Sequence, residues 1–146
     1  MRTAALDRLG WRRVVALVAV TALALVSTDC ARRTGSTRQP GVLETDVGLA
    51  SFYGPGFHGK LTASGVRFDM RRLVAAHPTY PFGTVVRVTN LTNGRSIVVR
   101  ILDRGPARRA QADGVIIDLA QRAAERLGFV REGRTRVRLD VLRWGG

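Results

Sequence analysis

Few side chains in this sequence can act as an acid, a base or a nucleophile. Those beyond residue 46 comprise two histidines and seven acidic residues, namely His58, His77, Asp69, Asp103, Asp113, Asp118, Glu125, Glu132 and Asp140. We expect Glu125 in a helix, Glu132 in a turn and Asp140 on the polar face of the last strand to be solvated. The sequence has no Ser-His-Asp order, no glycine-rich phosphate loop and no metal-ligand spacing, which leaves a few candidate carboxylates.

Asp103 lies where both a chemical and a structural role are possible. It follows the apolar run Ile97–Leu102 and opens the sequence Asp-Arg-Gly-Pro, which places it at the end of a strand. Burial by the strand raises the pKa of such a carboxyl group, whereas Arg100 and Arg104 lower it, and the sequence does not decide which effect is larger. An aspartate before Gly-Pro also commonly caps a turn, so both roles stay open.

Asp118 and His77 have structural explanations of their own. Asp118 occupies the N-cap position of a predicted helix, with Gln121 three residues later, as in a capping box. His77 follows the apolar segment Leu73–Ala76, where a buried, hydrogen-bonded histidine is more common than a catalytic one. Local chemistry alone therefore defines no reaction.

Strand signals dominate the part of the chain that must position these residues. The predicted strands are Val47–Tyr53, Thr84–Thr89, Ser96–Leu102, Val115–Ile117 and Thr135–Leu142. Asn93-Gly94 predicts a hairpin turn between the second and third of them. The four-residue spacing of Leu119, Ala123 and Leu127, followed by Gly128 as the C′ residue, predicts one short helix. Five or six short strands with one small helix predict a mainly β fold closed into a barrel, which leaves no sheet edge exposed.

The amino-terminal part of the chain has the pattern of an export signal. The 146 residues carry 24 basic and 11 acidic side chains, a formal net charge of +13 that by itself suggests a nucleic-acid partner. However, four arginines up to Arg13 precede an uncharged, mostly apolar stretch, Val14–Val26, which is shorter than the roughly 20 residues that span a bilayer. A buried core helix is the alternative interpretation. We predict a signal peptide at 1–29, a flexible linker at 30–46 and one domain at 47–143, in an exported envelope protein without a nucleic-acid partner.

Cys30 is the only cysteine, so the chain has no internal disulfide. It lies just past the apolar stretch, where a bacterial lipoprotein is cleaved and acylated, which predicts a lipid anchor in the membrane. The preceding Ser27-Thr28-Asp29 departs from the usual lipoprotein site, and Asp29 is the largest departure. Cleavage by an ordinary signal peptidase, with Cys30 left as a free thiol, is the competing interpretation.

Eight segments of the chain resemble the RlpA family, the rare lipoprotein A proteins of bacterial envelopes. They are Gly48–Gly54, Phe57–Ala63, Leu73–His77, Pro81–Thr84, Val86–Leu91, Asn93–Ser96, Asp103–Pro106 and Ile116–Leu119. The resemblance implies a six-stranded double-psi β-barrel, as in expansins and membrane-bound lytic transglycosylases. It also implies an endolytic lytic transglycosylase that cleaves the MurNAc–GlcNAc bond of peptidoglycan strands poor in stem peptides. The products carry 1,6-anhydro ends, and no metal or organic cofactor is needed.

The resemblance also implies roles for particular residues. Asp103 matches the family's acid, His77 its active-site histidine and Asp118 a second aspartate. The implied substrate-binding residues are Tyr53, His58, Thr62, Asp69 and Arg104. One carboxyl group can act first as acid and then as base if its pKa is raised toward neutrality.

One departure from the family bears on activity. The family usually has Ala-Asn-Gly-Glu before an aromatic-Asp pair, whereas this chain has Ala63-Ser-Gly-Val66, so Val66 replaces the glutamate. If that glutamate assists the chemistry, the alternative function is a non-catalytic, glycan-binding envelope lipoprotein. The expected partners are peptidoglycan glycan strands and, through Cys30, a membrane. We expect a monomer.

Overall fold

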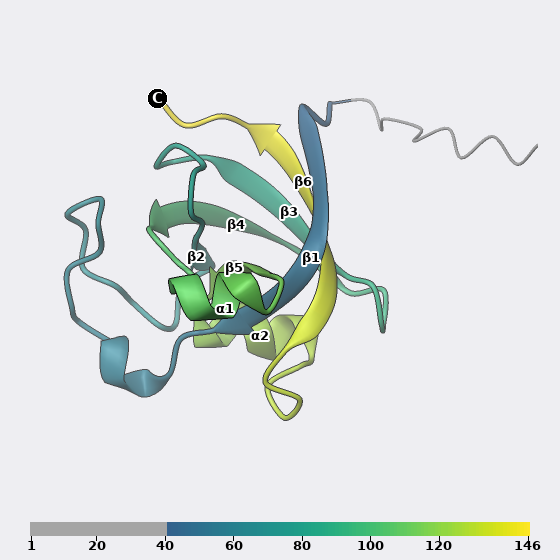
Figure 1. Ribbon diagram of the computed structural model, residues 1–146. Helices are drawn as coiled ribbons and strands as arrows, with labels where there is room; N and C mark the ends of the chain where they lie inside the picture. Colours follow the sequence, from purple (N-terminus) through teal and green to yellow (C-terminus); the bar gives the residue numbers. More distant parts are fainter. Residues whose placement is uncertain (1–40) are drawn as a thin grey trace, which may run out of the picture. The chain divides into compact units, whose positions relative to one another are not determined.

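The computed structural model describes residues 41–146 of the chain (Figure 1). The predicted signal peptide, Cys30 and most of the predicted linker lie outside the described residues. Within residues 41–146, no helix has both the length and the apolar character that crossing a membrane requires.

Six strands form a closed barrel in the described part of the chain, in the order β1-β5-β2-β4-β3-β6. Their bounds are β1 Glu44–Phe52, β2 Val74–Ala76, β3 Val85–Asn90, β4 Ser96–Asp103, β5 Val115–Leu119 and β6 Thr135–Arg143. The connections hold the 3-10 helix η1 Pro55–Phe57 and two α-helices, α1 Arg108–Ala112 and α2 Gln121–Leu127. The mainly β, closed barrel that the sequence predicted is therefore confirmed.

Two strand pairs are parallel, and they determine where the ends of the strands meet. β1 runs parallel to β5 and β2 runs parallel to β4, whereas the other neighbours in the barrel are antiparallel. Parallel neighbours need long crossover connections instead of hairpins. The connection from β1 to β2, which contains η1, projects from the strands in Figure 1, and the connection from β4 to β5 carries α1.

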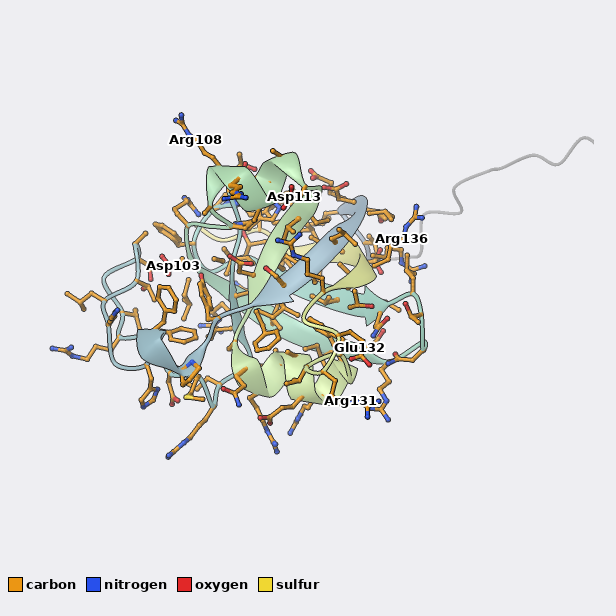
Figure 2. The ribbon with its side chains drawn as sticks, turned by 60° about the horizontal axis from the view of Figure 1, so that its bottom comes forward. Asp103, Arg108, Asp113, Arg131, Glu132 and Arg136 are labelled. Carbon is orange, nitrogen blue, oxygen red and sulfur yellow. The ribbon has the colours of Figure 1, made fainter. Side chains whose placement is uncertain are left out.

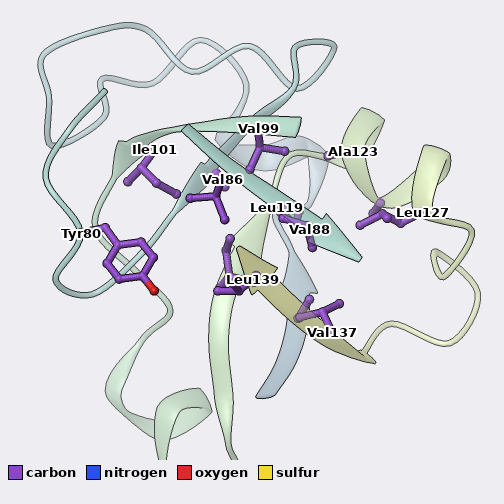
Figure 3. Packing of buried hydrophobic residues seen from close by; sticks show 14 of the residues in the cluster. Tyr80, Val86, Val88, Val99, Ile101, Leu119, Ala123, Leu127, Val137 and Leu139 are labelled. Carbon is purple, nitrogen blue, oxygen red and sulfur yellow. The ribbon is translucent and has the colours of Figure 1, made fainter. Parts of the chain in front are cut away.

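Alternating apolar residues of the strands fill the barrel (Figure 3). Val137, Leu139 and Val141 of β6 are fully buried, as the strict alternation predicted, whereas Arg136, which directly precedes Val137, is exposed. The cluster continues through the facing strands and α2 with Val86, Val88, Val99, Ile101, Ile117, Leu119, Ala123 and Leu127. This packed interior makes the barrel a rigid frame for residues on its outside.

The predicted turns are also confirmed. Asn93-Gly94 lies in the hairpin between the antiparallel strands β3 and β4, and Gly94 has a φ of 76°. Gly128 follows α2 in the left-handed conformation, with φ of 73° and ψ of 44°. Both positions favour glycine because a Cβ atom is unfavourable at positive φ.

The predicted N-cap role of Asp118 is wrong. Asp118 lies within β5, and α2 begins at Gln121 after Ala120, whose side chain makes no capping hydrogen bond. The strand continues through Leu119 because that residue pairs with both β1 and β2. Pairing on two sides outweighs one helix cap, which contributes about 1 kcal/mol. The carboxyl group of Asp118 is therefore presented by a strand.

Asp140 is buried, with 3% of its surface exposed, and the prediction of a solvated side chain is wrong. Thr45 Oγ1 donates a hydrogen bond to Asp140 Oδ1 at 3.0 Å, and Arg138 Nε donates to Oδ2 at 3.1 Å. Thr45 covers this carboxyl group because β1 starts at Glu44, three residues before the predicted start and within the predicted linker. Pairing with β6 extends β1 through residues 44–46. These residues are polar, so they lack the alternation of apolar and polar residues that predicts a strand. Glu125 and Glu132 are exposed, as predicted.

Candidate active site

The strand register places two aspartates on either side of one alanine. Ala76, the last residue of β2, pairs with Asp103 of β4 on one side and with Asp118 of β5 on the other. Ser51 of β1 pairs with Asp118 in turn. Directly paired residues point to the same face of a sheet, so these four form a row across four strands. The two aspartates stand two strands apart, which separates their backbones by about 10 Å.

An irregularity in each parallel pair sets this register. Between Ala75 and Ala76 the partner on β4 changes from Ile101 to Asp103, which skips one residue. Between Leu49 and Ala50 the partner on β5 likewise skips one residue. A bulge of this kind re-aims the side chains that follow it, because the side-chain direction alternates with every residue. Asp103 therefore points to the same face as Ala76.

The Tyr53 hydroxyl lies close to both carboxyl groups. It donates a hydrogen bond to Asp103 Oδ2 at 3.4 Å. A Cβ atom on Gly105 would lie 3.7 Å from the Tyr53 hydroxyl and 3.3 Å from Asp118 Oδ2, which puts the tyrosine and the second aspartate around the same glycine. Burial, and then the negative charges of Asp103 and Asp118, raise the pKa of Tyr53. The phenol is therefore protonated and available as a donor.

Backbone groups hold Asp103 in place. The N–H groups of Ala63 and Arg104 both donate to Asp103 Oδ1 at 2.8 Å. Ala63 belongs to the projecting connection between β1 and β2, so this bond also fixes that connection against the end of β4. Figure 2 shows Asp103 between the barrel and this connection. Both N–H groups bind Oδ1, so the Tyr53 hydroxyl is the partner of Oδ2.

Asp118 is the carboxyl group whose surroundings favour the protonated form. Burial raises the pKa of Asp118, although a hydrogen bond from Ser51 Oγ to Oδ1 and the positive charge of Arg134 act in the opposite direction. Arg134 itself pairs with Asp113 at 3.2 Å. A carboxyl group that keeps its proton closer to neutral pH meets the requirement for a general acid.

A cleft of about 600 Å³ opens beside this row of residues. Asp118, Ser51 and Tyr53 line it from the strands, and Phe57 of η1 and segment 104–108 line it from the connections. Asp103 is not among the lining residues, although its hydrogen-bond partners Tyr53 and Arg104 are. The volume lies within the range of sites that hold small ligands or a few sugar units.

Arg104 borders the cleft in a fixed position. Its Nη1 donates to the carbonyl oxygen of Tyr80 at 2.9 Å and to that of His77 at 3.4 Å. Its guanidinium lies over the ring of Phe82, 3.9 Å from the ring centre. These contacts limit the motion of the side chain, so Arg104 both supports the wall of the cleft and presents its remaining N–H groups.

His77 is not brought into the row of aspartates. Its ring is 5% exposed and stacks on Tyr80 with 3.6 Å between the ring centres, and Nδ1 accepts hydrogen bonds from the N–H groups of Thr79 and Tyr80. Ala76 faces the row, so strand alternation turns His77 to the other side. Burial lowers the pKa of His77 to about 4; the charge of Asp46 opposes this shift and Arg104 adds to it. The imidazole is therefore neutral at pH 7.

The other predicted substrate-binding residues lie in the connection between β1 and β2, and none of them lines the cleft. His58 Nδ1 is 3.8 Å from Asp69 Oδ1, and this oxygen also accepts the N–H of Arg71. Thr62 is buried, and its hydroxyl donates to the carbonyl oxygen of Val66 at 2.7 Å, which stabilises a turn. The Val66 side chain is 41% exposed.

Ser51, Gly105 and Arg108 are among the residues around the cleft that the sequence analysis did not single out as site residues. A signal existed for Ser51, because it precedes Tyr53 by two residues in a predicted strand and so shares its face. Gly105 lies in the Asp-Arg-Gly-Pro segment, but its proximity to Asp118 depends on the crossing of distant segments. No local pattern indicates Arg108. Among residues 41–146, no group of three or more His, Cys, Asp or Glu side chains is arranged to hold a metal ion.

The closed barrel with two parallel pairs and a carboxyl row beside a cleft defines a double-psi β-barrel protein with a candidate acid–base site. The family described as "Lytic transglycolase" matches residues 45–139, which include both aspartates and the whole row. The chain belongs to the RlpA family of these barrels.

Curated relatives agree with this assignment. The chain is 46% identical over 133 residues to the "Probable endolytic peptidoglycan transglycosylase RlpA" of Synechocystis sp., covering 91% of this chain and 38% of the relative. It is 44% identical over 114 residues to the "Endolytic peptidoglycan transglycosylase RlpA" of Campylobacter jejuni, covering 76% of this chain and 40% of the relative. The chain therefore spans well under half the length of these relatives.

Solved structures share the fold. A Streptomyces papain inhibitor superimposes with a TM-score of 0.55 at 25% identity, over 70% of this chain and 97% of the inhibitor. An expansin of Clavibacter michiganensis gives a TM-score of 0.54 at 21% identity, over 70% of this chain and 52% of the expansin. One of these two proteins is named as a protease inhibitor and the other as an expansin, so the barrel alone does not define an activity.

Proposed function

We propose that this protein is an endolytic lytic transglycosylase that cleaves the bond between N-acetylmuramic acid and N-acetylglucosamine in peptidoglycan strands poor in stem peptides. The observation that carries the proposal is the pairing of Asp103 and Asp118 on either side of Ala76, with the Tyr53 hydroxyl close to both and a cleft beside them. The names of the curated relatives support it.

The chemistry needs one proton donor and one proton acceptor. A protonated carboxyl group gives its proton to the glycosidic oxygen while the bond from that oxygen to C1 of the muramic acid breaks and positive charge builds on the ring. The 6-hydroxyl of the same sugar then attacks C1, and its proton passes to a carboxylate. Proton and bond counts balance without a water molecule, and the product is a 1,6-anhydro end. Asp103 and Asp118 are the two carboxyl groups that the row offers, and the protonated Tyr53 orients Asp103 through its hydrogen bond to Oδ2.

Digestion of purified glycan tests this proposal directly. The full chain is incubated with sacculi from which an amidase has removed the stem peptides, and 1,6-anhydromuramic ends are measured by mass spectrometry. Asp103→Asn and Asp118→Asn are each expected to lower the rate at least about 100-fold, the usual contribution of a general acid or base. Glu132→Gln changes an exposed carboxylate and is the matched control. Absence of anhydro products with the unaltered protein, or equal rates in both aspartate variants and the control, would overturn the proposal.

Val66 favours a second candidate function, a non-catalytic glycan-binding protein. Val66 stands where the family usually has a glutamate, and its carbonyl oxygen belongs to the turn that presents Ala63 to Asp103. This alternative predicts that the protein sediments with denuded sacculi without producing anhydro ends. Val66→Glu is then expected to create cleavage. Val66→Gln, which introduces a neutral side chain of similar length, is expected to bind glycan without cleaving it. Cleavage by the unaltered protein excludes the alternative.

We also propose that the protein is exported and anchored to a membrane of the cell envelope through a lipid on Cys30. The basic and apolar leader before this cysteine supports the proposal. Radiolabelled palmitate is expected to enter the full chain in bacterial cells and to be absent from Cys30→Ser. Equal labelling of both, or retention of the leader in the mature protein, would contradict it.

A further inference from the structure

Arg108 is a charged side chain at the cleft that the proposed reaction does not use. It is the first residue of α1, it is exposed, and it lines the same cleft as Asp118. Figure 2 shows its side chain extending from α1 away from the barrel. Within residues 41–146 no carboxylate or carbonyl group pairs with its guanidinium, so all of its N–H donors are available to a ligand.

The other arginine of the cleft does not have this freedom. Arg104 Nη1 donates to the carbonyl oxygens of Tyr80 and His77, and its guanidinium lies over the ring of Phe82. Arg104 therefore belongs to the wall of the cleft, whereas Arg108 is an exposed cation at its rim. The carboxyl group of Asp118 lines the same cleft and offers an anionic substrate group no compensating positive charge. An anionic group is accommodated best at the rim, next to Arg108.

A muramic acid residue offers such a group only in one form. Its lactyl ether ends in a carboxyl group, which is an uncharged amide when a stem peptide is attached and a free carboxylate when it is not. A guanidinium binds a carboxylate through two parallel hydrogen bonds and gains less from an amide. A single arginine at the rim can therefore distinguish bare strands from peptide-bearing ones.

We propose that Arg108 is a specificity-determining residue that binds the free lactyl carboxylate of a muramic acid residue lying along the cleft. This inference rests on the proposed function, because it takes the glycan strand as the ligand. It adds a physical reason why the site selects strands that have lost their peptides.

A binding experiment tests the inference separately from catalysis. The full chain carrying Asp103→Asn, which is expected to slow turnover at least about 100-fold, is titrated with fluorescently labelled glycan fragments that lack peptides. A second titration uses the same fragments after their lactyl carboxylates have been converted to methylamides. We expect the carboxylate form to bind about fivefold more tightly, the effect of one partly exposed charge pair. This preference is expected to weaken as salt increases.

Substitutions in α1 test whether Arg108 causes the preference for the carboxylate fragment. Arg108→Gln is expected to bind both fragments with the affinity that the parent has for the methylamide, whereas Arg108→Lys is expected to keep part of the preference. Arg109→Gln is the matched control, because Arg109 is exposed on the same helix but does not line the cleft. Thermal unfolding of each variant verifies that the barrel is intact.

Two results would overturn the inference. One is an unaltered preference in Arg108→Gln, and the other is the lack of any preference in the parent. Neither result bears on whether anhydro ends are formed, which is measured with the unaltered protein. Conversely, a protein that binds with this preference but never cleaves would overturn the proposed function and leave the role of Arg108 intact.

Discussion

At the scale of single residues, the two carboxyl groups of the candidate site differ in what holds them. Two backbone N–H groups bind Asp103, and they stay in place as long as the fold does. Asp118 is held by one side-chain hydroxyl, that of Ser51, and burial raises the pKa of its carboxyl group. The pKa of Asp118 therefore depends on the hydrogen bond from Ser51, which a single substitution of Ser51 removes.

Ser51→Ala tests this dependence through the pH profile of cleavage. The hydrogen bond from Ser51 favours the charged carboxylate, so its loss raises the pKa of Asp118 further. A general acid must be protonated, and activity falls as the pH rises through its pKa. The falling limb of the rate profile is therefore expected to move to higher pH. Ser96→Ala, which removes a hydroxyl contact with Thr89 in the distant hairpin, is the control. A limb that stays in place or moves to lower pH contradicts the assignment.

The lowered pKa of His77 predicts that the stability of the fold depends on pH. Its pKa is about 4 in the folded protein against 6.5 for a free histidine, so the unfolded chain binds more protons between these values. Above pH 6.5 His77 is neutral in both states, so its burial costs no stability. As the pH falls from 6.5 toward 4, protonation of His77 in the unfolded chain lowers the free energy of unfolding. The loss is on the order of 3 kcal/mol by pH 4. Urea unfolding at both pH values is expected to show this loss in the parent and not in His77→Gln. The exposed His58→Gln is expected to behave like the parent, and equal losses in all three proteins would refute the prediction.

At the scale of elements, the site depends on how closely the segment after β4 passes over the strands. Gly105 crosses above Ala76 and beside Asp118, and a side chain there would be in tight contact with both. A Cβ atom there would lie 3.2 Å from the Cβ of Ala76 and 3.3 Å from Asp118 Oδ2. The crossing segment thus excludes bulk water from one side of the carboxyl row while it forms the wall of the cleft with Arg104.

Gly105→Ala is expected to shift the Asp118 carboxyl group or the crossing segment by a few tenths of an ångström. Such a displacement lowers the cleavage rate by about tenfold or more, because catalytic groups tolerate little misplacement. The unfolding free energy falls by about 1–2 kcal/mol from overpacking. Gly56→Ala is the matched control, since a Cβ atom there meets nothing within 4 Å. Rates and urea unfolding curves of both variants verify this. Unchanged cleavage by Gly105→Ala would show that the close approach is not needed.

At the scale of the whole barrel, closure makes the core a single packed unit. β6 pairs with both β1 and β3, and its inward residues touch those of the facing strands. No strand of the barrel is left with a free edge, which limits fraying and pairing with other chains. A substitution that disrupts the packing of one strand is therefore expected to destabilise the whole barrel.

Leu139→Ala, in the centre of β6, is expected to lower the unfolding free energy by about 2–5 kcal/mol without making the transition less cooperative. Leu61→Ala is the control, because Leu61 is 66% exposed and its loss is expected to change stability by less than about 0.5 kcal/mol. Chemical denaturation monitored by tryptophan fluorescence and by circular dichroism measures both. Equal stability of the two variants, or two separate transitions in Leu139→Ala, would contradict a single closed core.

Local patterns in the sequence were enough to predict most of the strands, the hairpin at Asn93-Gly94 and the glycine after α2. Alternation along β6 and the turn preferences of glycine are properties of neighbouring residues, so they can be read without knowing the fold. The resemblance to the RlpA family singled out Asp103, Asp118, Tyr53 and Arg104, which the structure does bring to one region.

Only the tertiary structure decided how these residues meet. The pairing of Asp103 and Asp118 across Ala76 depends on registers between strands far apart in the chain and on two irregularities that no local pattern encodes. Strand pairing also turned Asp118 from a helix cap into a strand residue and left His77 on the other side of β2. The pairing of β1 with β6 buried Asp140 beneath Thr45. A strand's alternation follows from its own residues, but which of its faces carries a site depends on its partners, because one step of register exchanges the two faces.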